Sequence, residues 1–354
     1  MPEGRQRWIL AIVAVLLLGV GVAAALVYNT WRDVGRVDIE RLDSAAPPEQ
    51  EDQEGPDATA VPEFRLPPVP SAHDGIDTIL LVGSDERGSS DDLTQFGKFE
   101  GVRADVLMLL IRPRNNEENS ALVSLPRDLW VSTPCGQTRI NETLEGCDDM
   151  NGESTLLATV ESLTGLGVDH FAMVDMSGFQ HVVDEIGGYD ICLERPVRDE
   201  RAKLDLPAGC QTLDGSQTLA WLRSRSTLEQ TEDGRWVVMS GVSDLTRNER
   251  QRDFLIDMLG RLSNLSDPQD ALNVAQSVAP YVTVDSELGL SQAVSLAWTM
   301  RGLDDSVTEI PIPVEDYTTQ GGAQVLVAAV DIESVIADAV AVETVGEASR
   351  RNAG

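Results

Sequence analysis

Charged side chains occur in this sequence at the ends of short apolar runs, where charge is costly to bury. Three such runs, at residues 78–82, 106–111 and 121–123, have the length and composition of buried β-strands. The charged residues at their ends are Asp85, Arg87, Arg103, Asp105, Arg127 and Asp128. Carboxylate oxygens are the ligands that Mg²⁺ prefers, and guanidinium groups bind phosphate oxygens in bidentate fashion. These residue types together are suited to binding a Mg²⁺-pyrophosphate group.

A second group of charged residues lies far along the chain. Arg223 and Arg225 stand two residues apart at the end of a predicted helix over residues 216–224. Near the start of the next predicted helix, over residues 249–262, are Arg247, Arg250 and Gln251. Ligands of open α/β sheets bind beyond the strand ends, so we expect both groups to meet there. A single Arg-x-Asp at a strand end is more often a surface ion pair, and only the set of segments supports this interpretation.

Predicted strands and helices alternate from residue 75 to residue 342 without a long break. Further strands are expected at residues 171–174 and 307–312, and further helices at residues 153–163, 179–186, 268–278 and 291–300. Residues 325–330 and 332–340 complete the domain. This interleaving is typical of a single α/β domain. Residues 343–354 are expected to form a flexible tail.

The N-terminal part of the chain predicts a membrane anchor. Residues 1–7 contain Arg5 and Arg7, and the uncharged stretch at residues 8–31 includes about 20 apolar residues, enough to span a bilayer. Basic residues before the stretch place the N-terminus in the cytoplasm and the rest of the chain outside, as a single-pass protein of the cell membrane. A cleaved signal peptide is the alternative, because Ala23-Ala24-Ala25 resembles a cleavage site, although the stretch is longer than is usual for one.

The next segment, residues 32–74, is rich in Pro, Glu, Asp and Ala and contains few aromatic residues. Such a composition cannot bury enough apolar surface to fold, so a disordered acidic tether is predicted. The formal net charge of the whole chain is −32, which argues against nucleic acid as a partner.

Four cysteines, Cys135, Cys147, Cys192 and Cys210, lie in the part of the chain that is expected outside the cytoplasm. Disulfides form in such a compartment, and four cysteines allow three pairings. We favour Cys135–Cys147 and Cys192–Cys210, because each pair closes a short loop rich in turn residues. A zinc site is the alternative, but the gaps within the pairs are longer than the usual spacing of zinc ligands.

The charged segments resemble, in type and order, the signature blocks of the LytR-CpsA-Psr family. A strand followed by G-x-D-x-R and then R-x-D is matched by Asp85, Arg87, Arg103 and Asp105. The further blocks are matched by Ser124-Leu125-Pro126-Arg127-Asp128, Arg139-Ile140-Asn141, Val183-Asp184-Glu185-Ile186-Gly187-Gly188, Leu213-Asp214-Gly215 with Arg223 and Arg225, and Arg247 with Arg250 and Gln251. The resemblance covers nearly all of the chain outside the predicted tether and tail.

The resemblance implies a membrane-anchored enzyme with an α/β/α sandwich around a mixed β-sheet, preceded by one transmembrane helix. Such an enzyme takes a glycopolymer from a polyprenyl-pyrophosphate carrier and joins it to a peptidoglycan sugar hydroxyl. Carried over to this chain, Asp85 and Asp105 hold Mg²⁺ or Mn²⁺. The phosphate-binding residues are Arg87, Arg103, Arg127, Arg223, Arg225, Arg247, Arg250 and Gln251. One of Asp85, Asp105 and Asp128 is the general base, and wall teichoic acid, arabinogalactan and capsule all remain open as the polymer.

Other functions remain as alternatives. A Ser-His-Asp hydrolase is disfavoured, because no G-x-S-x-G sequence occurs and the histidines are only His73, His170 and His181. A pyrophosphatase that acts on the lipid-linked pyrophosphate is closer, because water could replace the sugar hydroxyl at the same site. A polyprenyl-phosphate-binding protein without catalysis also fits the charged residues.

Overall fold

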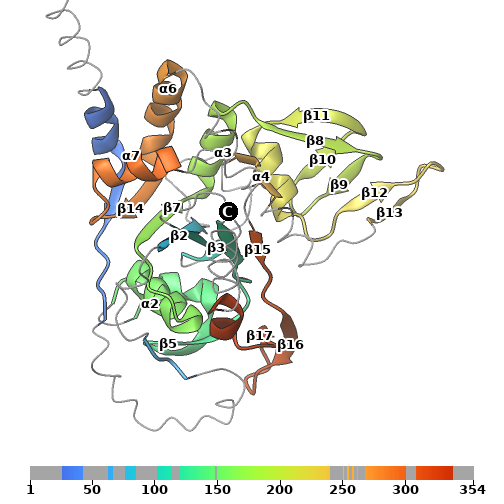
Figure 1. The fold of residues 1–354 in the computed structure, drawn as a ribbon. Helices are drawn as coiled ribbons and strands as arrows, with labels where there is room; N and C mark the ends of the chain where they lie inside the picture. The colour runs from blue at the N-terminus through green and yellow to red at the C-terminus, as the bar shows by residue number, and fades with distance from the viewer. Residues whose placement is uncertain are drawn as a thin grey trace, which may run out of the picture.

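The computed structural model describes residues 26–42, 63–66, 76–84, 102–113, 120–147, 150–239, 250, 253–254, 257–258, 261, 268–299 and 308–337. Strands and helices alternate along these residues, as the sequence predicts for an α/β protein. Figure 1 shows a central sheet with helices beside it and a smaller lobe of short strands to one side.

The central sheet has seven strands in the order β1-β14-β7-β2-β3-β4-β15. Their bounds are Gly35–Val37, Val282–Asp285, His170–Val174, Ile76–Ser84, Ala104–Pro113, Ala121–Ser124 and Thr308–Ile310. The sheet is mixed, since β2 pairs with β7 in parallel and with β3 in antiparallel orientation. The strands predicted at residues 78–82, 106–111, 121–123, 171–174 and 307–312 are all confirmed.

The two faces of the sheet bury alternate residues of the same strands. Leu80, Leu107 and Leu109 belong to the larger core, which also contains Leu156 and Val160 of α2 (Gly152–Thr164). Ile79, Met108 and Leu110 form a smaller cluster with Leu122. Helix α2 is defined at both ends, because the Asn151 side chain accepts a hydrogen bond from Ser154 N and Gly165 takes a left-handed conformation. The sheet therefore has apolar packing on both faces.

A second lobe has its own core and surrounds α3 and α4. Helix α3 (Met176–Glu185) begins after Asp175, and α4 (Gly215–Arg223) begins with a capping box of Asp214 and Gln217. The strands of the lobe are β8 (Tyr189–Leu193), β9 (Val197–Asp199), β10 (Leu204–Leu206), β11 (Gly209–Leu213), β12 (Leu228–Gln230) and β13 (Trp236–Val238). They form a β11-β8 pair and a sheet in the order β10-β9-β12-β13. Among the described residues, this lobe contains half of the strands that the sequence did not predict.

The remaining elements belong neither to the central sheet nor to the second lobe's strands and helices named above. They are β5 (Trp130–Thr133), β6 (Gly136–Arg139), the 3-10 helices η3 (Ile140–Glu145) and η4 (Ala279–Tyr281), α6 (Pro268–Val278), α7 (Leu290–Thr299), β16 (Val314–Thr318) and β17 (Gln324–Ala328). The helices predicted over residues 268–278 and 291–300 are confirmed, the second within one residue at each end.

The prediction of a disordered tether over residues 32–74 is wrong for its first part. Residues 26–33 are helical and Gly35–Val37 form β1 at the edge of the central sheet. Val37 and Ile39 pack against the larger core, and Phe64 is buried. The prediction failed because it rested on the average composition of the whole segment, which is acidic and does not reflect these few apolar residues. Residues 43–62 and 67–75 lie outside the described residues.

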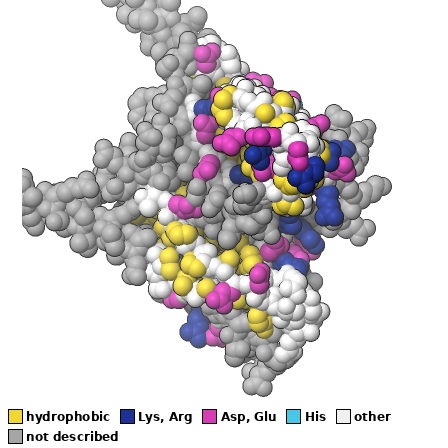
Figure 2. Space-filling model, turned by 90° about the vertical axis from the view of Figure 1, so that its right-hand side faces the viewer, with side chains coloured by type: hydrophobic (Ala, Val, Ile, Leu, Met, Phe, Trp, Pro, Cys, Tyr) yellow, Lys and Arg dark blue, Asp and Glu magenta, His cyan; other side chains and the backbone are white. Residues whose placement is uncertain are grey.

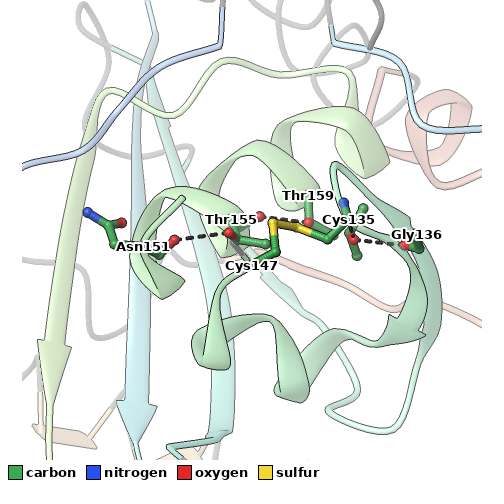
Figure 3. The surroundings of a disulfide bond; sticks show 7 residues. Cys135, Gly136, Cys147, Asn151, Thr155 and Thr159 are labelled. Carbon is green, nitrogen blue, oxygen red and sulfur yellow. Dashed lines mark hydrogen bonds between the residues drawn. A yellow bond between two sulfur atoms is a disulfide. The ribbon is translucent and has the colours of Figure 1, made fainter. Parts of the chain in front are cut away.

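Both predicted disulfides, Cys135–Cys147 and Cys192–Cys210, are present. Figure 3 shows the first beside α2, where Thr155 Oγ1 donates to Asn151 O at 2.9 Å and Thr159 Oγ1 to Thr155 O at 2.7 Å. The second joins residues directly opposite each other on β8 and β11. Within the described parts of the chain, no helix is long and apolar enough to cross a membrane. Residues 1–25, most of the predicted anchor, and the predicted tail lie outside them.

Candidate active site

Three strand ends meet at one edge of the central sheet. Ser84 at the end of β2 pairs with Ala104 at the start of β3, and Leu125 N donates to Leu107 O just beyond β4 at 2.9 Å. This register brings Arg127, two residues after Leu125, opposite Asp105. Arg127 Nη1 donates a hydrogen bond to Asp105 Oδ1, and both side chains are about four-fifths buried. The sequence prediction that these two segments converge is confirmed.

Arg127 also lies near a second carboxylate. Its Nε atom is 3.5 Å from Asp128 Oδ2, so one guanidinium bridges two acids that both belong to the predicted set. A largely buried guanidinium between carboxylates keeps its orientation without a bound anion. Asp85 and Arg87, which follow β2 directly, lie outside the described residues.

Buried oxygen atoms occur beside this ion pair. Ser84 Oγ and Asn141 Oδ1 are buried and, among the described residues, have no hydrogen-bond partner. Asn141 is linked to the site, because its backbone N–H donates to Arg127 O at 3.2 Å. Carboxylate, hydroxyl and amide oxygens are the donor set of a hard cation or of its bound waters. The residues present at this edge therefore fit a Mg²⁺ site, although among the described residues no three acidic, histidine or cysteine side chains cluster as ligands.

Arg103 points toward a different pair of acids. Its guanidinium lies 3.9 Å from Glu142 Oε1 and 3.6 Å from Glu145 Oε1, both on η3. Burial raises the pKa of Glu142, but hydrogen bonds from Thr138 and Arg139 outweigh it, so the pKa lies below the ordinary value. The ionised Glu142 thus provides a negative charge beside the Arg103 guanidinium.

Arg223 lies at the same edge of the sheet as Ser84. Its Nη1 atom donates to Met176 Sδ at 3.2 Å. Met176 follows β7, whose Val174 pairs with Gly83 of β2. The last turn of α4 thus brings a guanidinium from the second lobe to the strand ends of the central sheet.

A buried carboxylate holds the turn that carries Arg223 and Arg225. Asp199 Oδ2 accepts hydrogen bonds from Ser224 Oγ at 2.8 Å and from Ser226 N at 3.1 Å. Burial raises the pKa of Asp199, but these bonds and those from the N–H groups of Arg201 and Ala202 outweigh it, so the pKa lies below the ordinary value. No sequence signal marks Asp199, because it is distant in sequence from the turn that it fixes.

Arg250 contacts α4 instead of the strand ends. Its guanidinium lies 4.3 Å from the centre of the Trp221 ring, and Nη1 donates to Trp221 O at 3.4 Å. Burial lowers the pKa of Arg250. The contact places Arg250 as a support for the last turn of α4. Arg247 and Gln251 lie outside the described residues.

Basic side chains are interspersed with carboxylates on the face that Figure 2 shows, and the described residues form no broad basic surface there. The described candidate site consists of single guanidinium groups that are paired with, or close to, an acid or another polar atom. Such an arrangement is suited to a small, highly charged group.

The profile of the LytR_cpsA_psr family matches residues 43–338. The chain therefore belongs to the LytR-CpsA-Psr family. This is the family that the charged segments resemble, and β1 precedes the matched region.

Individual proteins are similar over much of the chain. A probable cell wall biosynthesis protein LcpB from Corynebacterium glutamicum is 36% identical over 247 residues, covering 67% of this chain and 54% of its own length. The chain thus spans about half the length of that relative. A polyisoprenyl-teichoic acid–peptidoglycan teichoic acid transferase TagU from Bacillus mycoides is 26% identical over 89% of both chains.

The fold is shared with solved structures. A LytR-Csp2A-Psr enzyme from Actinomyces oris is 25% identical and aligns with a TM-score of 0.60 over 86% of this chain and 95% of its own. TagT bound to LIIa-WTA aligns with a TM-score of 0.54 at 22% identity, over 75% of this chain and 89% of its own. The mixed α/β fold around a mixed central sheet is therefore that of the family.

Proposed function

We propose that this chain is an extracytoplasmic phosphotransferase that moves a glycopolymer from a polyprenyl-pyrophosphate carrier to a peptidoglycan sugar hydroxyl. Its domain would be an α/β/α sandwich held at the cell membrane by one N-terminal transmembrane helix. The observation that carries the proposal is the convergence of the Arg127–Asp105 pair and Arg223 at one sheet edge. Membership of the family and the transferase name of the Bacillus mycoides relative support it.

The guanidinium groups would bind and orient the pyrophosphate. Arg127 and Arg223 come from different lobes, so they can contact the phosphate oxygens from two sides. Negative charge on the leaving lipid phosphate grows as the bond to the transferred phosphorus breaks, and fixed positive groups stabilise that charge. Asp199 would position the turn of Arg223 and Arg225 without contacting the substrate.

Asp85 and Asp105 would hold a Mg²⁺ or Mn²⁺ ion, with the buried hydroxyl of Ser84 beside them. When bound, such an ion neutralises charge on the pyrophosphate oxygens. The sugar hydroxyl forms a new P–O bond to the transferred phosphorus, and the P–O bond to the lipid phosphate breaks. The hydroxyl proton passes to a carboxylate, for which Asp85, Asp105 and Asp128 are the candidates.

The test is a product analysis with the purified full chain in detergent micelles. A lipid-pyrophosphate-linked saccharide and peptidoglycan oligomers are supplied with Mg²⁺, and products are identified by mass spectrometry. We expect saccharide-phosphate on the oligomer and polyprenyl monophosphate. Release of free saccharide phosphate without an oligomer product would establish the pyrophosphatase instead, and donor binding without turnover would establish a lipid-binding protein.

A matched pair of variants excludes contamination. Arg223→Ala should lose most of the transfer, whereas Arg235→Ala should keep it, because Arg235 is largely exposed and pairs with Asp233 in the β12–β13 turn. Equal activity of the two variants would contradict the assignment of Arg223.

A further inference from the structure

The chain that leads into the domain is bound to it residue by residue. We call residues 26–41 the juxtamembrane segment. Its β1 strand pairs in parallel with β14, and Val37 O accepts a hydrogen bond from Ser286 N at 2.8 Å. Gly35 approaches β14 closely, because a Cβ at this position would lie 2.7 Å from Thr283 Oγ1. Strand pairing of this kind fixes both the position and the direction of the incoming chain.

Two arginines fasten the segment, Arg36 within β1 and Arg41 four residues after it. Arg36 Nη1 donates to Leu288 O at 2.9 Å, and its guanidinium lies 4.0 Å from the centre of the Trp31 ring. Arg41 Nη1 donates to the buried Glu161 at 3.2 Å, and Nη2 donates to Val168 O at 2.8 Å. The segment is therefore held by side chains as well as by backbone pairing.

The register of the sheet shows from which edge the segment enters. Gly35 pairs with Thr283, Thr283 pairs with Met173, and Met173 pairs with Val82. The chain before Gly35 therefore leaves the sheet at the edge where β7 and β2 end. Asp105, Ser84 and the Met176–Arg223 contact lie at this same edge.

Apolar side chains are exposed on the incoming segment. Leu26, Val27 and Tyr28 are 38%, 37% and 56% exposed, and Val294 on α7 is 52% exposed. Helix α7 begins two residues after Leu288, the acceptor of the Arg36 hydrogen bond, so it starts close to the segment. Figure 1 shows the helix of residues 26–33 in dark blue at the margin of the domain.

The predicted anchor continues directly into this helix. Its apolar stretch ends near Tyr28, and aromatic residues such as Tyr28 and Trp31 are typical of the membrane–water interface. A single residue, Val34, separates the helix from β1. One extended residue reaches at most about 3.5 Å, so the domain has almost no slack relative to the helix.

We propose that the surface formed by residues 26–33 and the exposed side of α7 rests on the lipid bilayer, and that docking of the segment turns the active-site edge toward the membrane. The inference rests on the membrane attachment in the proposed function. In this proposal the juxtamembrane segment holds the domain in a fixed orientation relative to the membrane, whereas a flexible tether would let the domain rotate freely. The pyrophosphate of a lipid carrier lies at the headgroup level, which is where this orientation places the guanidinium groups.

A cysteine cross-link tests the docking in the membrane. In the full chain in lipid nanodiscs, Gly35→Cys with Thr283→Cys should form a disulfide spontaneously, because the two positions are register partners in close contact. Gly35→Cys with Val238→Cys, on the distant β13, should not. Non-reducing peptide mapping reads out both. Absence of the first cross-link in a folded protein would overturn the proposal.

Depth-dependent quenching tests the orientation. All four native cysteines are in disulfides, so a single added cysteine can carry a fluorophore. With headgroup-quencher lipids, a probe at Val294→Cys should lose most of its fluorescence and one at Val238→Cys little, and Arg36→Ala with Arg41→Ala should reduce the difference. Equal quenching at both positions would overturn the orientation. Loss of transfer with both signals intact would instead count against the proposed function alone.

Discussion

The two sides of the candidate site are held by different kinds of structure. On the central-sheet side, Arg127 is fixed by ion pairs to Asp105, at the start of the ten-residue strand β3, and to Asp128, shortly after β4. On the second-lobe side, Arg223 and Arg225 sit on a turn that depends on the hydrogen bonds of one carboxylate, Asp199. The sheet side is thus a rigid part of the main core, whereas the lobe side can be disturbed without loss of that core. This separation allows each side to be altered alone.

The largest effect is expected on the sheet side. Arg127→Ala should lower the transfer rate by about a hundredfold, since removing a positioned contact to developing charge costs about 3 kcal/mol. It also leaves the largely buried Asp105 without its guanidinium partner. Steady-state transfer assays beside thermal melts measure both. A variant that folds and retains near-normal transfer would remove Arg127 from the site, and Arg235→Ala is the matched control.

Removing the Cys192–Cys210 disulfide of the second lobe should lower the free energy of unfolding, and should affect transfer only through the folding of the lobe. Cys192→Ala with Cys210→Ala opens a loop with a sequence separation of 18 residues, and we expect a loss of about 2–4 kcal/mol in unfolding free energy. Strand β11 leads directly into the Asp214 cap of α4, so transfer should fall along with the lobe. Denaturant melts measure the loss. The matched control removes the other disulfide, by Cys135→Ala with Cys147→Ala. If this control lowered the transfer rate as much as the lobe variant under conditions where both are equally folded, the claim that the lobe side of the site can be disturbed by itself would be contradicted.

Asp199→Asn tests whether the turn is held by charge. The pKa of Asp199 is lowered, so its ionised form stabilises the folded state above the ordinary Asp value of about 3.9, and that stability is lost as the pH falls through the lowered pKa. The free energy of unfolding of the variant should be lower by about 1–3 kcal/mol at neutral pH. It should also lack the loss of stability that the wild-type protein shows as the pH falls through the pKa of Asp199. Melting temperatures across pH measure it. An unchanged acid profile would contradict the role of Asp199.

The smallest effect is expected at Glu161. Burial raises its pKa, against the hydrogen bond from Val168 N and the charge of Arg41, while Asp169 adds to the rise. Stability linked to this group therefore falls as the pH rises from the ordinary Glu value of about 4.3 through the raised pKa. Glu161→Gln should remove this pH dependence of the unfolding free energy. Arg41→Ala should make the pH dependence larger, because it removes a charge that opposes the rise of the pKa, and it should have no such effect when combined with Glu161→Gln. A steeper profile in the double variant would refute this coupling.

The sequence predicts the central sheet well, because β2, β3 and β4 are continuous apolar runs bounded by charged residues. It fails for strands of three residues such as Gly35–Val37, whose pairing partner β14 is far along the chain, and Val197–Asp199, which pairs with the equally short β10 and β12. The convergence of Asp105 with Arg127 follows from strand ends and can be predicted. The role of Asp199 cannot be predicted, because it depends on the packing of Asp199 against the turn at Ser224, which is distant from it in the sequence.

The central claim is that Arg127 and Arg223 contact the same pyrophosphate. A double-mutant cycle on the transfer rate tests it most directly, using Arg127→Ala, Arg223→Ala and both together in the purified full chain. The account predicts that the combined loss departs from the sum of the single losses by about 1 kcal/mol or more, because two groups that share one substrate group are coupled. Strictly additive losses in folded variants would contradict it.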